Sequence, residues 1–169
     1  MAVNFPEGTQ NFPSNIIQVK QTVYTGLFSM SGNWATISGL NCVITPKSTS
    51  NRIMICCHIG ILTYEFNTVV IGFLRDSTAI YRGDADGSRE RVTHRSDGRQ
   101  RGDNNHGFGI CAIGYDAPST TGGITYKVRM TGEDRNKTGR VNRHLNNDNN
   151  DNPRNSRTAS SLTLIEYAP

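Results

Sequence analysis

The chain lacks the features that mark membrane proteins and secreted proteins. Its 169 residues contain no apolar window of the ~18 residues that a membrane-spanning helix needs, so no segment is expected to cross a membrane. Residues 1–12 have neither the basic start nor the apolar run of a secretory signal. We therefore expect a protein that is made in a cytoplasm.

Catalytic motifs are also missing. The sequence has no G-x-S-x-G elbow, no P-loop lysine motif and no G-x-G-x-x-G after a predicted strand. Glu65, Glu133 and Asp134 are the candidates for a carboxylate pair that cleaves a glycan, as in a tailspike depolymerase. Sequence spacing does not show that two of them reach the separation of ~5 to ~9.5 Å that this chemistry requires. We predict that the protein is not an enzyme, and glycan cleavage is a minor alternative.

Cysteines and histidines do not have the spacing of a metal site. The four cysteines lie in predicted strands among apolar residues, so we interpret them as reduced core residues. The Asn- and Asp-rich tract at residues 146–152 lacks the glycine and glutamate of an EF-hand loop, so we interpret it as solvated, and cation binding there is left open. No metal or cofactor is predicted. The cysteines are Cys42, Cys56, Cys57 and Cys111.

What the sequence does have is strand-like alternation. In residues 39–60, two alternating apolar runs flank a polar break that begins at Pro46. The second run is apolar on both faces, which is more burial than one sheet partner supplies in a small sandwich. Ile53, Ile55 and Ile59 are therefore predicted to belong to a strand that serves both the core and an oligomer contact.

The rest of the chain predicts more short strands and no helix. About eight to ten strands with turns between them indicate an all-β, antiparallel β-sandwich of jelly-roll type, as a single domain over residues 16–169. Residues 1–15 predict a short extended N-terminal arm, whose Phe5 and Phe12 are candidate anchors on a neighbouring protein. We expect strands within residues 16–30, 34–45, 52–64, 69–75, 79–82, 89–94, 107–115, 124–130, 140–145 and 158–168.

Basic and acidic residues are mixed along the chain. The net charge is +4, and the arginines gather in residues 75–101 and 129–157 together with several acids. Such mixed charge is more typical of a solvated rim or a subunit contact than of a nucleic-acid groove. Nucleic acid is therefore not predicted as a partner.

Five segments carry a family resemblance. They are IIQVKQTVYTGLFS, SGLNCVITPKSTSNRIMI, GFLRDSTAIYRGDADGSRERVT, YDAPSTTGGITYKVRM and RTASSLTLIEYA, and their order spans residues 16–167. The set resembles small virion proteins and the C-terminal domains of tail fibres or head fibres of marine and freshwater bacteriophages, cyanophages especially. This chain departs from the usual serine- and threonine-rich second segment at Cys42, Cys56 and Cys57.

The resemblance implies a structural role on a virion. It implies a homotrimeric, fibre-tip type module on the virion surface, with other virion proteins and host-surface carbohydrate as partners. The alternative that it leaves open is a decoration or head-fibre protein that binds and reinforces the capsid. Copy number per virion distinguishes these two positions.

Overall fold

The computed structural model describes residues 16–64, 68–96, 107–132, 134, 136–144 and 149–169. In these residues two antiparallel sheets pack face to face, so the predicted all-β sandwich is confirmed. A single 3-10 turn at Pro153–Asn155 is the helical part of the described chain. No described helix is long and apolar enough to cross a membrane.

Sheet A is the larger sheet, and its long strand β4 pairs with three others. β4 pairs with β8 along one edge, and with β11 and then β10 along the other edge. Its members are β1 (Ile16–Tyr24), β11 (Ser160–Tyr167), β4 (Arg52–Tyr64), β8 (Phe108–Asp116), β10 (Thr138–Val141) and β2 (Phe28–Ser31).

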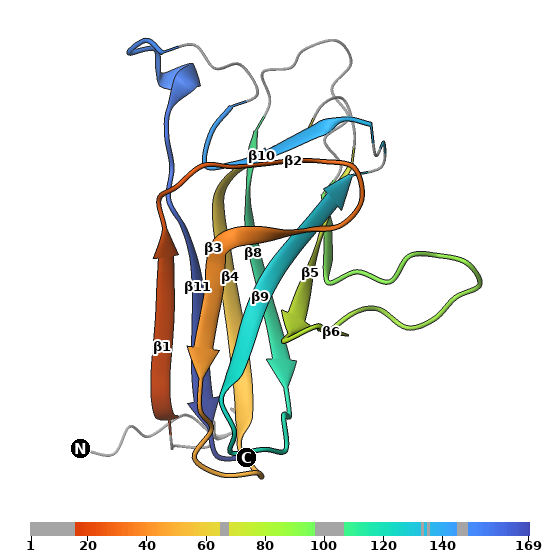
Figure 1. Cartoon of the computed structure of the whole chain (residues 1–169), viewed down its shortest axis with the longest axis vertical. Helices are drawn as coiled ribbons and strands as arrows, with labels where there is room; N and C mark the ends of the chain where they lie inside the picture. Colours follow the sequence, from red (N-terminus) through yellow and green to blue (C-terminus); the bar gives the residue numbers. More distant parts are fainter. Residues whose placement is uncertain (1–15, 65–67, 97–106, 133, 135, 145–148) are drawn as a thin grey trace, which may run out of the picture.

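Sheet B lies against sheet A, and Figure 1 shows its strand β9 crossing in front of β4 and β8. Its central strands β9 and β5 pair with each other, and the two short strands β6 and β7 both pair with β5. The members are β3 (Ala35–Ile44), β9 (Ile124–Gly132), β5 (Val69–Arg75), β6 (Thr78–Ile80) and β7 (His94–Ser96).

The strand pairs are nested along the chain. β1 pairs with β11, β2 with β10, β3 with β9, β4 with β8, and β5 with both β6 and β7. A long antiparallel hairpin that folds over on itself produces this order. The turn at residues 45–51, which includes the predicted break at Pro46, carries the chain from β3 in sheet B to β4 in sheet A.

A left-handed glycine shapes β3. Gly39 has a φ of +89°, and the strand shifts register between Thr36 and Asn41. A Cβ at Gly39 would lie 2.5 Å from ring atoms of Tyr24, so a larger residue meets both backbone strain and a steric clash there. This bend keeps β3 close to β1 at the edge of the sandwich.

The expected strand at residues 89–94 is mostly wrong. Only His94–Ser96 pairs as β7, and residues 81–93 form a segment that extends away from the sandwich (Figure 1). The segment carries charged residues rather than an alternating apolar face, so it has little to bury in a sheet. It folds back on itself, with the Gly83 N–H donating to the Val92 carbonyl at 3.2 Å.

The apolar core lies between the two sheets. Ile53, Ile55 and Ile59 of β4 have no exposed surface and belong to this core. Burial of each such side chain contributes about 1.5–3 kcal/mol relative to exposure. Phe5 and Phe12 of the predicted arm lie outside the described residues.

Candidate functional site

The outer face of sheet A has no Asp, Glu, Lys or Arg across three rows of paired residues. Each row crosses β1, β11, β4 and β8 in that order. We call these twelve residues the uncharged face. The first row is Val19, Ile165, Met54 and Tyr115; the second is Gln21, Thr163, Cys56 and Ile113; the third is Val23, Ser161, His58 and Cys111.

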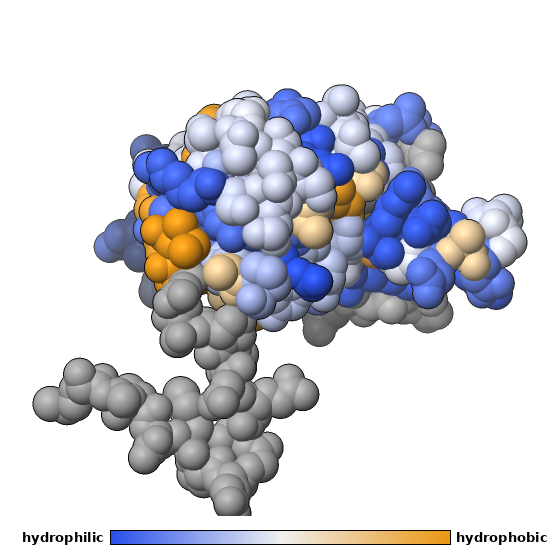
Figure 2. All heavy atoms as spheres, turned by 90° about the horizontal axis from the view of Figure 1, so that it is seen from below, coloured by the Kyte–Doolittle hydropathy of each residue, from blue (hydrophilic) through white to orange (hydrophobic). Residues whose placement is uncertain are grey.

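Much of the uncharged face is apolar and open to solvent. Val19, Val23 and Ile113 are each more than half exposed, and Tyr115 is 48% exposed. The apolar surface continues along β1 to Ile16, which is 65% exposed. Figure 2 shows hydrophobic spheres gathered at the side of the molecule where β1 lies, while the lobe on the opposite side is hydrophilic. Exposed apolar surface of this extent marks an interaction site more often than chance.

The three isoleucines predicted for both core and contact point away from the uncharged face. Because side chains alternate along a strand, the surface that β4 offers to a partner consists of Met54, Cys56 and His58 instead. The three isoleucines pack in the core and thereby hold β4 so that its other side faces outward.

The prediction that all four cysteines are core residues is wrong for two of them. All four are free thiols, with Cys42 and Cys57 buried, but Cys56 is half-buried and Cys111 is exposed. Both of these belong to the uncharged face, which is apolar enough in sequence to resemble a buried face. Burial, with smaller contributions from the nearby Cys111 and Cys56, raises the pKa of Cys57 to about 12.

The outer face of sheet B has the opposite character. The Arg129 guanidinium lies 4.1 Å from the centre of the Trp34 ring, a cation–π contact. Gly72 makes room for this pair, because a Cβ there would meet both side chains at 3.2–3.5 Å. The Trp34 indole N–H donates to the Glu90 carboxylate, which fastens the segment of residues 81–93 to this face. The sequence shows no such stacking pair, since its members are far apart along the chain.

A groove of about 450 Å³ opens beside this stack, which we call the outer groove. Thr131 of β9 lies in its wall and is 1% exposed, yet its hydroxyl has no hydrogen-bond partner among the described residues. Two positions earlier on the same face, the Arg129 Nε is also buried and unpartnered within that part of the chain. The lining residues are Thr68, Val70, Arg89, Glu90, Val92, Arg95, Thr131 and Gly132.

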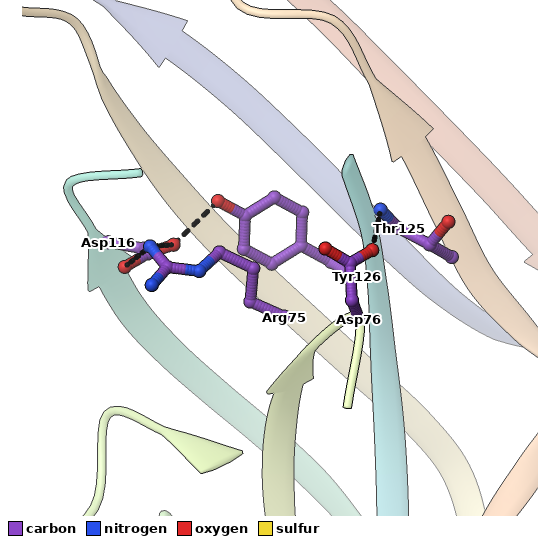
Figure 3. Close-up of polar contacts among 5 residues, drawn as sticks. All are labelled: Arg75, Asp76, Asp116, Thr125 and Tyr126. Atoms are coloured by element: carbon purple, nitrogen blue, oxygen red, sulfur yellow. Dashed lines mark hydrogen bonds and ion pairs between the residues drawn. The ribbon is translucent and has the colours of Figure 1, made fainter. Parts of the chain in front are cut away.

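A polar network joins the two sheets at the end of β5, as Figure 3 shows. The Arg75 guanidinium donates to both Asp116 oxygens at 3.1–3.2 Å, and the Tyr126 hydroxyl donates to the same carboxylate at 2.7 Å. Next to it, the Thr125 N–H donates to the Asp76 carboxylate at 3.0 Å. Burial and the bond to Asp116 raise the pKa of Tyr126, so it remains a neutral donor. The network therefore serves to connect β5, β8 and β9.

A buried carboxylate organises the turn between β3 and β4. Glu166 has no exposed surface, and it accepts from the Lys47 N–H at 2.7 Å and from Asn51 and Gln18 side-chain amides at 2.5 Å. Burial raises the pKa of Glu166, but these bonds and one from the Ser48 backbone outweigh it and hold the pKa below its ordinary value. Glu166 thus ties the turn to the end of β11.

The described residues hold no group of three or more His, Cys, Asp or Glu side chains suited to a metal ion. Glu65 and Glu133, two of the carboxylates considered for glycan cleavage, lie outside those residues, and so does part of the tract at residues 146–152. Comparison with protein-family models and with curated proteins finds no match to this chain. The two surfaces of the sandwich are therefore the basis for a functional interpretation.

Proposed function

We propose that this chain is a bacteriophage virion structural protein, a fibre-type surface module that forms a homotrimer through the uncharged face. The assignment to a virion rests on the sequence resemblance. The observation that carries the oligomer is the absence of charge from the three rows on the outside of sheet A.

Symmetry explains why an uncharged face suits a second copy of the same chain. Residues close to a symmetry axis meet their own copies, so a charged residue would face a like charge there. A face that carries only apolar and neutral polar side chains avoids this repulsion. Sheet B, with Lys127 and Arg129 on its outer side, does not have this property.

The size of the face fits an interface. Four strands ~4.8 Å apart and three rows, which cover about six residues of ~3.4 Å on each strand, give roughly 400 Å². The whole face, polar side chains included, is similar in size to the largest apolar patch on typical monomers, ~300–600 Å², which is often functional. It is about half of the ~800 Å² that one partner contributes to a standard interface, so the strand edges must contribute as well.

The fold supports the same proposal. The nested strand pairs are the order expected for a jelly roll, in which a long hairpin folds into two sheets. Jelly rolls recur in viral shells, although a fold by itself does not define a function. The proposed module therefore combines a jelly roll with one face kept for its own copies.

A charge placed on the uncharged face tests the oligomer. Ile113→Lys puts a cation at the β8 end of the second row, and light scattering is expected to change from three times the 18.6 kDa chain mass to the mass of one chain. The matched control is Val43→Lys on the outer face of sheet B, because Val43 and Ile113 are similarly exposed at 58% and 55%. The control is expected to stay trimeric.

Other results would contradict the proposal. A wild-type chain that is monomeric at micromolar concentration would refute the trimer. A dimer would be consistent with a contact through the uncharged face but would refute the threefold symmetry. Loss of the oligomer in both variants would mean that the contact is not specific to sheet A. Circular dichroism of each variant checks that it is folded.

The position on the virion is tested separately. A few trimers per particle would support a fibre, and tens to hundreds of copies would support capsid decoration instead. Residues 1–15, with Phe5 and Phe12, are proposed as the attachment arm. Deletion of residues 1–14 is expected to leave the oligomer folded while incorporation into virions falls, and normal incorporation would refute the arm.

A further inference from the structure

The outer groove has the chemistry of a ligand site that is separate from the uncharged face. Its volume of about 450 Å³ falls within the ~300–1,000 Å³ typical of small-molecule sites. It lies on sheet B, whereas the proposed subunit contact lies on sheet A, so the groove stays open in the oligomer. The segment of residues 81–93 forms one wall, and β5, β7 and β9 form the rest.

The buried hydroxyl of Thr131 is the strongest indication of a ligand. A buried polar group without a partner costs about 1–3 kcal/mol, so proteins rarely keep one without a reason. Valine has almost the same shape as threonine and would remove this cost. A threonine at this wall of the groove therefore leaves one hydrogen bond that a bound molecule can complete.

The charges around the groove favour an anion. Its lining includes two arginines, Arg89 and Arg95, and one carboxylate, Glu90. The Arg89 side chain is 75% exposed and shares one ion pair with Asp86, which leaves other guanidinium N–H groups facing solvent. Burial lowers the pKa of Arg129, while the Glu90 carboxylate raises it and the charge of Arg82 lowers it by a smaller amount. A carboxylate in the groove would meet two arginines for the one acidic side chain of the lining.

We infer that the outer groove binds an acidic sugar, a ring with several hydroxyl groups and one carboxylate. The arginines supply donors for the carboxylate, and Thr131 and Glu90 supply hydrogen-bonding groups for the ring hydroxyls. Val70 and Val92 give the groove an apolar surface against which a sugar ring packs. The inference rests on the proposed surface position for its role, which is contact with host-surface carbohydrate.

Ligand-observed NMR on the full chain tests the inference with three probes. Glucuronate carries both the ring and the carboxylate, glucose lacks the carboxylate, and acetate lacks the ring. Glucuronate is expected to bind at least about tenfold more tightly than either of the others, because each of them lacks at least one hydrogen bond to a charged group. No binding of glucuronate at millimolar concentration, or equal binding of acetate, would overturn the inference.

Two variants locate the binding site. Thr131→Val is expected to weaken glucuronate binding roughly fivefold while thermal stability stays the same or rises, because the hydroxyl has no partner among the described residues. Its control is Thr125→Val, on the same face of β9 but beyond the groove. Arg89→Gln should also weaken binding, and Arg52→Gln, an exposed arginine on β4, should not. Unchanged affinity in Thr131→Val would refute the site.

The outcomes separate this inference from the proposed function. Ile113→Lys is expected to break the oligomer and to leave glucuronate binding intact, since Ile113 lies on sheet A and Thr131 of the groove lies on sheet B. A chain that is monomeric but binds glucuronate refutes the oligomer alone. A trimer that binds none of the probes refutes the groove alone.

Discussion

Glu166 gives the sharpest test of how this fold is held together, because a single substitution removes its charge and keeps its shape. Glu166→Gln retains an acceptor, but the side chain no longer offers an anion to the Lys47, Asn51 and Gln18 donors. Charge-assisted hydrogen bonds are roughly twice as strong as neutral ones, so the bonds from Lys47 and Asn51 weaken, and the bond from Gln18 is lost because its amide meets the new NH₂ group; the total is about 3 kcal/mol. The neutral amide is less costly to bury, which offsets part of this loss. We expect unfolding free energy to fall by about 2 kcal/mol at pH 7.

The pH dependence provides a second, independent signature. The pKa of Glu166 is lower in the folded chain than in the unfolded chain, so its stabilising contribution is present above the ordinary glutamate pKa of ~4.3. That contribution is lost as the pH falls through the folded pKa. Glu166→Gln cannot titrate, so the stability difference between wild type and variant should shrink as the pH falls from ~6 to ~3.

Urea unfolding at a fixed protein concentration measures both effects, because the proposed oligomer would make stability depend on concentration. Asp151→Asn is the control, since Asp151 is an exposed carboxylate near the 3-10 turn. It is expected to change the unfolding free energy by less than about 0.5 kcal/mol. Equal stability of wild type and Glu166→Gln at pH 7, or a difference that does not change with pH, would refute the reasoning.

Three further predictions follow from individual contacts. Tyr126→Phe removes the donor to Asp116 and should cost about 1–3 kcal/mol in thermal unfolding, and no change would mean that the network does not hold the sheets together. A maleimide should label Cys111 in dissociated chains but not in the proposed oligomer, and rapid labelling in the oligomer would contradict burial of Cys111 at the contact. Cys57, with its pKa of about 12, should react only after denaturation. Gly39→Ala should destabilise by about 1–2 kcal/mol, because of its positive φ and the nearby Tyr24 ring, and an unchanged melting temperature would show that the bend is soft.

The sequence predicts the strands best where alternation ends at polar or charged residues. The expected ranges 52–64 and 69–75 coincide with β4 and β5, since each apolar run has a clear limit on both sides. The range 16–30 is instead two strands, because the chain turns at residues 25–27 and β2 pairs with β10. Such a break depends on a distant partner strand, which local alternation does not reveal.

The outer groove could not be predicted from the sequence, because the side chains that form it and the adjacent stack come from separate strands. Trp34 and Arg129 meet only because β3 pairs with β9, and Glu90 reaches them from a segment that was expected to be a strand. The unpartnered hydroxyl of Thr131 is a property of packing, not of residue type. Sequence periodicity predicts which face of a strand is apolar, but it does not predict which side chains from separate strands converge.

The contrast between the two outer faces explains why the pattern in residues 39–60 predicts more burial of β4 than the structure shows. A strand that is apolar on both sides is typical of the interior, yet β4 is buried on one side only. The chain covers sheet B with its own segment, which Trp34 and Glu90 fasten in place. Among the described residues, the segment reaches the uncharged face only where the Tyr81 ring meets the edge of Tyr115, and Ile113 and Tyr115 stay about half exposed. The sequence predicts that both faces of β4 are buried. The prediction is accounted for if another copy of the chain covers the uncharged face.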